Sequence, residues 1–125
     1  MNSSTAPIWQ PSAERIAATR LTAFMAEADR RWNRRLVGAD YAHLHAWSVE
    51  HAEEFWASVW KFGEVRGEMG ATVVVGREKM PGAQWFPEAR LNFAENLLRR
   101  RDDADALVFW GEDKVKGRAS HAELY

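Results

Sequence analysis

Residues 12–32 read SAERIAATRLTAFMAEADRRW, and their spacing decides how the first part of the chain folds. Apolar side chains recur every three or four positions in this stretch, at Ala17, Leu21, Phe24, Met25, Ala28 and Trp32. Such spacing is typical of a helix that buries one stripe of its surface against a core. Ser12 suits the N-cap, and Glu14 suits the positive end of the helix dipole. We therefore expect one long helix from Ser12 onward, until Gly38 breaks the pattern.

Two further helices are expected before the next glycine. Asp40 can cap a short helix that carries Leu44 and Trp47. Ser48 can cap another helix, whose apolar residues continue until Gly63 closes it. The first half of the chain is therefore predicted to consist of three successive helices.

Beyond Gly63 the helical periodicity gives way to short runs separated by glycine and proline. The β-branched run Thr72-Val-Val-Val75 predicts one short strand within a long connection. Asn92 can cap a fourth helix, which would extend from Phe93 to about Arg100.

The last part of the chain predicts a β-hairpin followed by the start of a helix. Residues 106–110 have the pattern of a buried strand and residues 115–119 that of a returning strand, with Gly111-Glu-Asp113 as the turn. Ser120 and Glu123 have the spacing of a capping box, which marks the first turn of a helix. A single helical turn and an isolated hairpin are both marginal, so we expect an incomplete domain that further chain would complete.

These elements together predict an α+β protein. Residues 1–105 would form a helix-rich N-terminal cap of three to four helices, and residues 106–125 the first hairpin and helix start of a larger domain. The 125 residues suffice for one modest core and not for two independent domains.

Composition excludes several classes of protein. The chain has 17 Lys and Arg against 18 Asp and Glu, a net charge of -1, which gives no general attraction to nucleic acid. It contains no cysteine, which excludes disulfides and thiolate catalysis, and a reducing cytoplasm is the expected compartment. The apolar runs are far shorter than the roughly 20 residues that span a bilayer, so we expect no membrane partner. Residues 1–8 lack the pattern of a secretory signal.

No motif for catalysis or for cofactor binding is found. A GxSxG elbow is absent, and no glycine-rich phosphate loop contains Lys61, Lys79, Lys114 or Lys116. His43 and His45 would point to different faces of a helix, and His51 with Glu54 is one i,i+3 pair without a second, so no metal site is expected. Two acidic pairs are interpreted as solvated surface charge, Glu53-Glu54 and Asp102-Asp103. No residue is therefore predicted to be catalytic, cofactor-binding or metal-binding.

A basic cluster ends the first predicted helix and consists of Arg30, Arg31, Arg34 and Arg35. Cations suit the negative end of a helix dipole, so a solvated helix end is the simpler interpretation. Guanidinium groups also match the geometry of oxyanions. A phosphate or partner site on these arginines is therefore the alternative.

The most individual stretch runs from Pro81 to Leu98 and reads PGAQWFPEARLNFAENLL. Its proline turns, aromatic pair and asparagines predict an ordered docking loop. In this stretch the sequence resembles the N-terminal region of the acetoacetyl-CoA synthetases, which belong to the AMP-forming (adenylate-forming) acyl-CoA synthetase superfamily. The resemblance extends to other segments, namely Trp9-Gln-Pro-Ser12, Trp47-Ser-Val-Glu-His51, Glu54-Phe-Trp56, Gly111-Glu-Asp113 and Ser120 to Leu124. Two positions depart from the family pattern: Glu88, where a glycine is usual, and His121, where an aromatic is common.

The resemblance implies a parent enzyme that activates acetoacetate with ATP and Mg²⁺ to an acyl-adenylate and then transfers the acyl group to CoA. The family's phosphate loop, adenine-binding motifs and lid lysine lie beyond Tyr125, so none of these functional residues can be assigned here. The chain would be the cap of such an enzyme, inactive alone, with the AMP-binding domain of the same protein beginning at residue 106 and continuing downstream.

A hypothesis of a different class is a free-standing interaction module from a truncated synthetase gene. Such a module would form a homodimer, or bind another partner, through the aromatic face. It would expose apolar patches of more than a few hundred Å².

Overall fold

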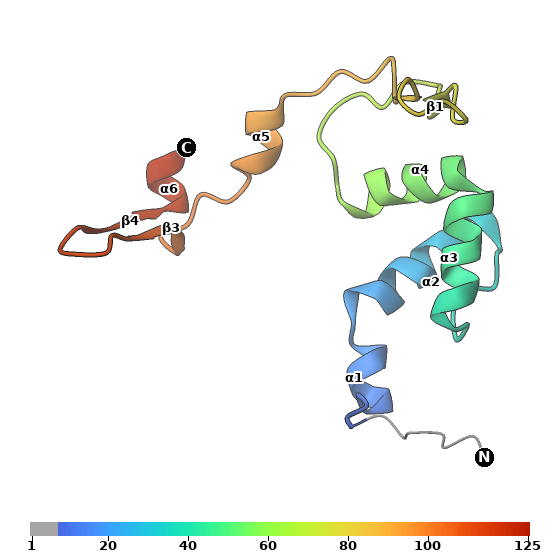
Figure 1. The fold of residues 1–125 in the computed structure, drawn as a ribbon, viewed down its shortest axis with the longest axis horizontal. Coiled ribbons are helices and arrows are strands. Elements are labelled where there is room, and N and C mark those ends of the chain that lie inside the picture. Colours follow the sequence, from blue (N-terminus) through green and yellow to red (C-terminus); the bar gives the residue numbers. More distant parts are fainter. Residues whose placement is uncertain (1–7) are drawn as a thin grey trace. The chain divides into compact units, whose positions relative to one another are not determined.

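The computed structural model describes residues 8–125. The prediction that residues 1–8 are not a secretory signal therefore concerns residues that lie almost wholly outside the described range. The chain divides into two compact units between Glu64 and Val65. The described part of the first unit is helical, and the second contains four short strands in two antiparallel pairs (Figure 1). The predicted α+β class is confirmed.

The first predicted helix is in fact two helices. α1 spans Ala13–Ala17 and α2 spans Arg20–Trp32, and Ser12 caps α1 as predicted. Thr19 separates the two because its hydroxyl oxygen accepts a hydrogen bond from the backbone N–H of Thr22 at 3.2 Å and so caps α2. The prediction of one continuous helix was wrong, since an apolar stripe does not reveal a threonine that competes for backbone groups.

α2 also ends earlier than predicted, at Trp32 instead of near Gly38. Asn33 closes it in the left-handed conformation, with a φ of 51°. The carboxylate of Asp29 accepts a hydrogen bond from the backbone N–H of Leu36 at 2.9 Å. This contact holds the loop after α2 against the helix, and Leu36 is fully buried.

α3 spans Tyr41–Glu50 and α4 spans Ala52–Phe62. Asp40 caps α3 as predicted, since its carboxylate accepts a backbone hydrogen bond at 2.8 Å. The prediction that Ser48 begins the next helix was wrong, because its hydroxyl donates to a carbonyl within α3 at 2.7 Å. α4 starts instead after His51, where no side chain caps the helix.

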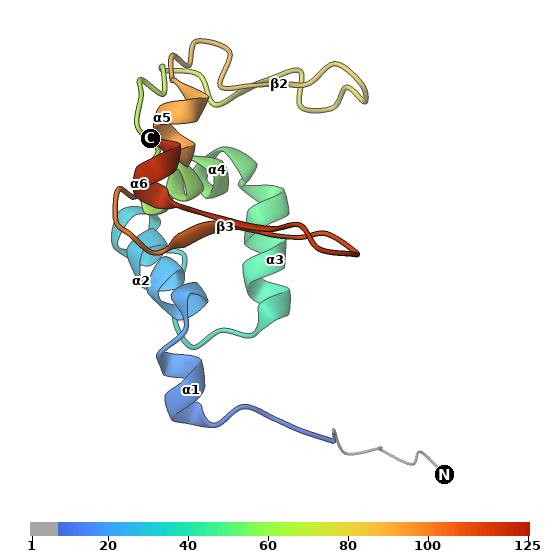
Figure 2. The same ribbon diagram turned by 90° about the vertical axis from the view of Figure 1, so that its left-hand side faces the viewer.

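Three helices and the loop after α2 form the core of the first unit. Figure 2 shows α2, α3 and α4 near one another, and the buried core residues are Phe24, Met25, Ala28, Leu36, Leu44 and Trp47. The ring of Phe24 meets those of Phe55 and Phe62 edge to face, with centroid distances of 5.8 and 5.4 Å. The predicted stripe is therefore buried at Phe24, Met25 and Ala28 and partly buried at Trp32, whereas Leu21 is 48% exposed.

The second unit begins with a two-stranded pair that was half predicted. β1 spans Val74–Val75 and pairs antiparallel with β2, Gln84–Trp85. The expected strand at residues 72–75 is thus shorter, and its partner was missed because proline and glycine turns surround it. α5 spans Phe93–Leu97, shorter than predicted, and Asn92 caps it as predicted.

The end of the chain forms the predicted hairpin. β3 spans Asp105–Trp110 and pairs antiparallel with β4, Lys116–Ser120. α6 spans His121–Leu124, and the capping box between Ser120 and Glu123 is present in both directions. Within residues 8–125, no helix is long and apolar enough to cross a membrane.

Candidate functional site

Glu54 on α4 is the centre of a charged network in the first unit. Its carboxylate accepts hydrogen bonds from the Arg34 Nε at 2.8 Å and from the Trp47 indole Nε1 at 3.1 Å. The Nδ1 of His51 lies 4.0 Å from the carboxylate. Only 18% of the Glu54 side chain is exposed, whereas the adjacent Glu53 is an exposed residue. The network therefore ties α4 to α3 and to the loop after α2.

The Arg34 guanidinium holds the pKa of Glu54 below its ordinary value, and the Trp47 hydrogen bond acts in the same direction against the effect of burial. In return, the hydrogen bond to Glu54 raises the pKa of Arg34. Glu54 thus acts as a structural anion that holds Arg34 and Trp47. The interpretation of Glu54 and Arg34 as solvated charges was wrong, because their pairing depends on a tertiary contact that no local pattern reveals.

The histidines serve local packing rather than a shared centre. The Nε2 of His43 lies 3.2 Å from the carbonyl oxygen of Arg34, and the ring of His45 lies 6.2 Å from that of Tyr41. In the part of the chain that the structure describes, no group of three His, Cys, Asp or Glu side chains could hold a metal ion. Asp102, 53% exposed, pairs with Arg100, which lowers the pKa of Asp102.

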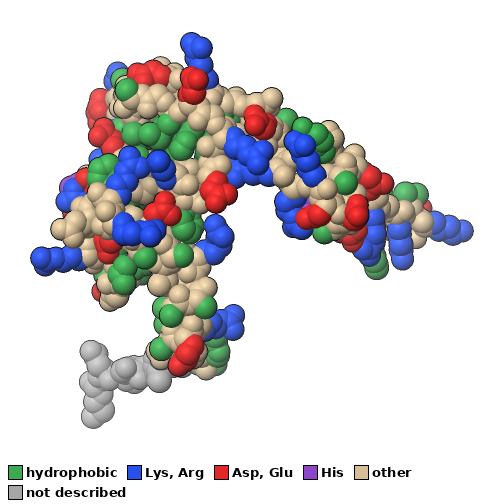
Figure 3. All heavy atoms as spheres, turned by 180° about the vertical axis from the view of Figure 1, so that it is seen from behind, with side chains coloured by type: hydrophobic (Ala, Val, Ile, Leu, Met, Phe, Trp, Pro, Cys, Tyr) green, Lys and Arg blue, Asp and Glu red, His purple; other side chains and the backbone are tan. Residues whose placement is uncertain are grey.

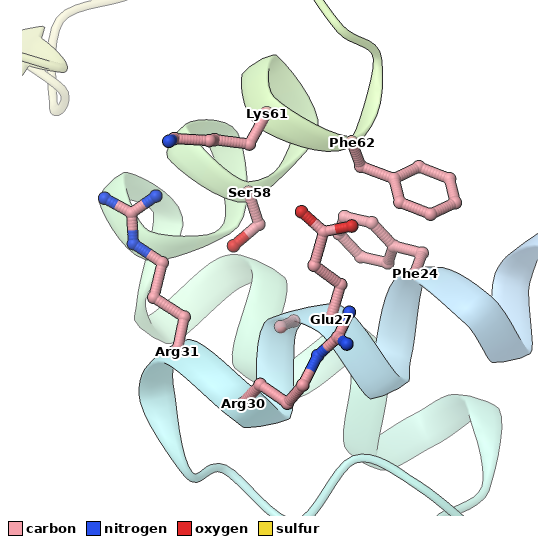
Figure 4. A pocket seen from close by; sticks show the side chains of 8 residues that line it. Phe24, Glu27, Arg30, Arg31, Ser58, Lys61 and Phe62 are labelled. Atoms are coloured by element: carbon pink, nitrogen blue, oxygen red, sulfur yellow. The ribbon is translucent and has the colours of Figure 1, made fainter.

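A hollow of about 490 Å³ lies between α2 and α4 (Figure 4). Its charged lining consists of Glu27, Arg30, Arg31 and Lys61, and its apolar lining includes Phe24 and Phe62. Ser58 also lines the hollow and is buried. Its hydroxyl accepts a hydrogen bond from the Trp32 indole at 2.9 Å and donates to the carbonyl of Glu54 at 2.8 Å. We call this feature the basic hollow.

An apolar groove of about 400 Å³ is lined by residues of α2, α3 and α4. Its apolar lining consists of Leu21, Phe24, Leu44, Phe55, Val59 and Phe62. Arg20 also lines it, and its guanidinium lies 5.1 Å from the centre of the Phe62 ring. Tyr41, His45 and Ser48 also line the groove. Its apolar residues offer a surface to an apolar partner.

Glu88 fixes the loop that leads into β1. Its carboxylate accepts hydrogen bonds from the backbone N–H of Ala71 at 2.7 Å and from the hydroxyl of Thr72 at 2.8 Å. These hydrogen bonds, the Thr72 hydroxyl first, lower the pKa of Glu88. A Cβ on Gly70, whose φ is +81°, would lie 2.7 Å from the Cβ of Glu88. The residue that departs from the family pattern is therefore a structural clamp, which the sequence did not indicate.

Asn96 is a second clamp in the same unit. Its Oδ1 accepts a hydrogen bond from the backbone N–H of Arg66, and its Nδ2 donates to the carbonyl of Arg66, both at 2.8 Å. Glu68 and Arg90 form a bridge beside it, with backbone hydrogen bonds of 2.8 and 2.9 Å. The most individual stretch of the sequence is thus ordered, as predicted, by backbone contacts to residues 66–72.

The β3–β4 hairpin leaves its apolar residues exposed. Leu107, Val108, Phe109 and Trp110 are 57, 52, 59 and 68% exposed, although the sequence has the pattern of a buried strand. Figure 3 shows hydrophobic side chains at the surface between charged ones. A strand of this composition is ordinarily covered on both faces. The hairpin is therefore a second candidate docking surface.

Part of the chain matches a known protein family. Residues 41–97, from the first residue of α3 to the last residue of α5, match the family described as the acetyl-coenzyme A synthetase N-terminus. The clamps at Glu88 and Asn96 fall within this range, as does Glu54, whereas its partner Arg34 lies before it. This stretch of the chain is therefore similar to the N-terminal region of acetyl-coenzyme A synthetases.

The individual proteins that the chain is similar to include several acetoacetyl-CoA synthetases. The chain is 43% identical over 118 residues to the acetoacetyl-coenzyme A synthetase of Rhizobium meliloti, and 35% identical over 111 residues to that of Danio rerio. It matches the solved structure of the acetoacetyl-CoA synthetase from Streptomyces lividans with a TM-score of 0.80 and 40% identity. In sequence and fold, the chain is similar to a part of acetoacetyl-CoA synthetases, as the resemblance predicted.

The comparisons cover most of this chain and a small part of the relatives. The Rhizobium meliloti alignment covers 94% of this chain and 18% of the relative, and the Danio rerio alignment covers 87% and 16%. The structural match likewise covers 94% of this chain and 18% of the Streptomyces lividans chain. The chain thus spans less than a fifth of the length of the synthetases it matches.

Proposed function

We propose that this chain is the N-terminal structural region of an AMP-forming acetoacetate–CoA ligase. That enzyme converts acetoacetate, ATP and CoA to acetoacetyl-CoA, AMP and pyrophosphate. The observation that carries the proposal is the alignment of 94% of the chain with acetoacetyl-CoA synthetases in both sequence and structure. The absence of cysteine fits a reducing compartment, so we propose a cytoplasmic location.

The proposed role is structural, with no catalysis by the chain itself. Its two most constrained carboxylates, Glu54 and Glu88, both have lowered pKa values because they hold other groups in place. A general acid near neutral pH needs the opposite shift. We assign ATP, Mg²⁺ and CoA to the AMP-binding domain, which would begin at residue 106 and continue downstream.

The exposed apolar surfaces support a docking role. The groove between α2, α3 and α4 and the hairpin residues from Leu107 to Trp110 would each gain stability from being covered. We propose that the rest of the synthetase supplies that cover, so that the helical cap packs its aromatic face on the catalytic core.

A chimera tests this role directly. This chain would replace the aligned N-terminal region of the Rhizobium meliloti enzyme, and acetoacetate-dependent AMP release would be measured. We expect a folded, active chimera, whereas the chain alone should release no AMP. A folded chimera without activity, next to an active parental enzyme, would contradict the proposal.

The second candidate is a free-standing module that forms a homodimer. The exposure of Phe109 and Trp110 on a strand with one open edge favours it. Size-exclusion chromatography with light scattering would give a concentration-dependent dimer if the open edge pairs with a second copy. A monomer at all concentrations would contradict the homodimer and favour the role as a synthetase cap.

A further inference from the structure

We propose that the basic hollow between α2 and α4 is a binding site for a small phosphate-bearing anion. The hollow lies wholly within the first unit and uses none of the docking surfaces considered above. The inference therefore stands or falls independently of the ligase proposal. It also assigns a role to two arginines that the sequence left as a solvated helix end.

Cations from two helices line the hollow, and among the described residues none of them is in an ion pair. Arg30 and Arg31 come from the last turn of α2, and Lys61 comes from α4. Across residues 8–125, no carboxylate forms an ion pair with any of the three, whereas Arg34, Arg100 and Arg118 each pair with one. A place near a helix end accounts for each cation singly. It does not account for the presence of all three around one hollow.

The hollow is partly preorganised. The guanidinium of Arg31 lies 4.8 Å from the centre of the Trp32 ring, so stacking restricts its position. The Trp32 indole is fixed in turn by its hydrogen bond to the buried hydroxyl of Ser58. A side chain that is already ordered loses less entropy when it binds a ligand.

The chemistry of the lining favours phosphate. Guanidinium forks match the oxygens of a phosphate in a bidentate manner, and an ammonium adds a point charge. A volume of about 490 Å³ suits a small molecule, and Phe24 and Phe62 give it one apolar side. The net charge of -1 argues against a nucleic-acid polymer as the ligand.

Glu27 gives the proposal a distinctive signature. Figure 4 shows its carboxylate among the lining side chains, near Phe24 and Ser58. Three cations against one carboxylate leave the lining positive, but the carboxylate repels an anion. Its removal should therefore strengthen binding, while removal of Arg31 or Lys61 should weaken it.

The test is a titration of the chain with inorganic pyrophosphate, AMP and adenosine, followed by NMR signals of the Trp32 indole N–H and the Ser58 amide. We expect saturable shifts with pyrophosphate or AMP and none with adenosine. Binding of pyrophosphate alone identifies free phosphates as the ligand. Tighter binding of AMP identifies a phosphate ester whose base lies on the Phe24 and Phe62 side, and both outcomes support the site.

Variants distinguish binding in the basic hollow from nonspecific attraction of the anion to positive charge. Arg31→Gln and Lys61→Gln should each weaken binding about fivefold, and Glu27→Gln should strengthen it about twofold to fivefold, since partly exposed charge pairs contribute up to about 1 kcal/mol. Arg35→Gln removes the same charge outside the hollow and should change affinity little. The absence of saturable shifts, or equal weakening by Arg35→Gln and Lys61→Gln, would overturn the proposal. Unchanged spectra of the free variants elsewhere establish that each is folded.

Discussion

The two units of this chain keep their conformation by different means. Among residues 8–125, every buried residue lies in the first unit, where Leu36 and Trp47 are 0 and 4% exposed. The second unit buries none of its large apolar side chains and relies on hydrogen-bond clamps at Glu88 and Asn96. The comparison indicates that the first unit has a packed core of its own. The second presents exposed apolar side chains such as Phe109 and Trp110.

The largest effect that tests this difference is a core truncation. Leu36→Ala should lower the free energy of unfolding by about 2–5 kcal/mol, because it removes a fully buried side chain and leaves a cavity. The matched control is Val108→Ala in β3, 52% exposed, which should change it by about 0.5 kcal/mol or less. Urea denaturation followed by tryptophan fluorescence measures both. Similar losses in the two units would refute the contrast.

The next effect concerns the charged network. Glu54→Gln should lower the free energy of unfolding by about 1–3 kcal/mol, because Arg34 loses its anionic partner while the side chains at positions 34 and 54 remain partly buried. The adjacent Glu53→Gln removes the same charge from the surface and should have almost no effect. If urea denaturation gives the same midpoint for both variants, then the network is not what ties α4 to its neighbours.

Acid sensitivity follows from the direction of the shift at Glu54. Its pKa is lower in the folded state than in the unfolded state, so its contribution to stability is fully present above the unfolded pKa and is lost as the pH falls through the folded one. The unfolding midpoint of the wild type should therefore fall more steeply from about pH 5 to about pH 3 than that of Glu54→Gln. Parallel pH profiles would show that Glu54 is not held ionised by Arg34.

The smallest effect is local to the second unit. Glu88→Ala removes the acceptor of the Ala71 and Thr72 amides and should speed their hydrogen exchange without a measurable change in the global unfolding midpoint. Glu78→Ala, also on the surface, serves as the control and should leave both amides unchanged. Unaltered exchange in Glu88→Ala would mean that the loop is held by other contacts.

Local signals in the sequence were sufficient for several elements. The caps at Ser12, Asp40 and Asn92 and the capping box at Ser120 were correct, because a cap is a contact between residues a few positions apart. The β3–β4 hairpin was correct for the same reason.

Tertiary contacts explain what the sequence did not reveal. The Glu54 and Arg34 pair joins residues far apart in the chain, and the Glu88 clamp does the same within the second unit. The basic hollow combines Arg30 and Arg31 with Lys61 from another helix, so only half of it was visible as a charge cluster. Thr19 was overlooked because its capping role competes with an otherwise regular apolar stripe.

Hydrogen exchange measured on the chain alone and within the synthetase chimera tests the central claim most directly. If the second unit is a surface that the rest of the enzyme covers, backbone amides of β3, Asp105–Trp110, should be far better protected in the chimera than in the chain alone. Amides of α2 and α4 should differ much less between the two proteins, because their core is already packed in the chain alone. Equal protection of β3 in the two proteins would contradict the account.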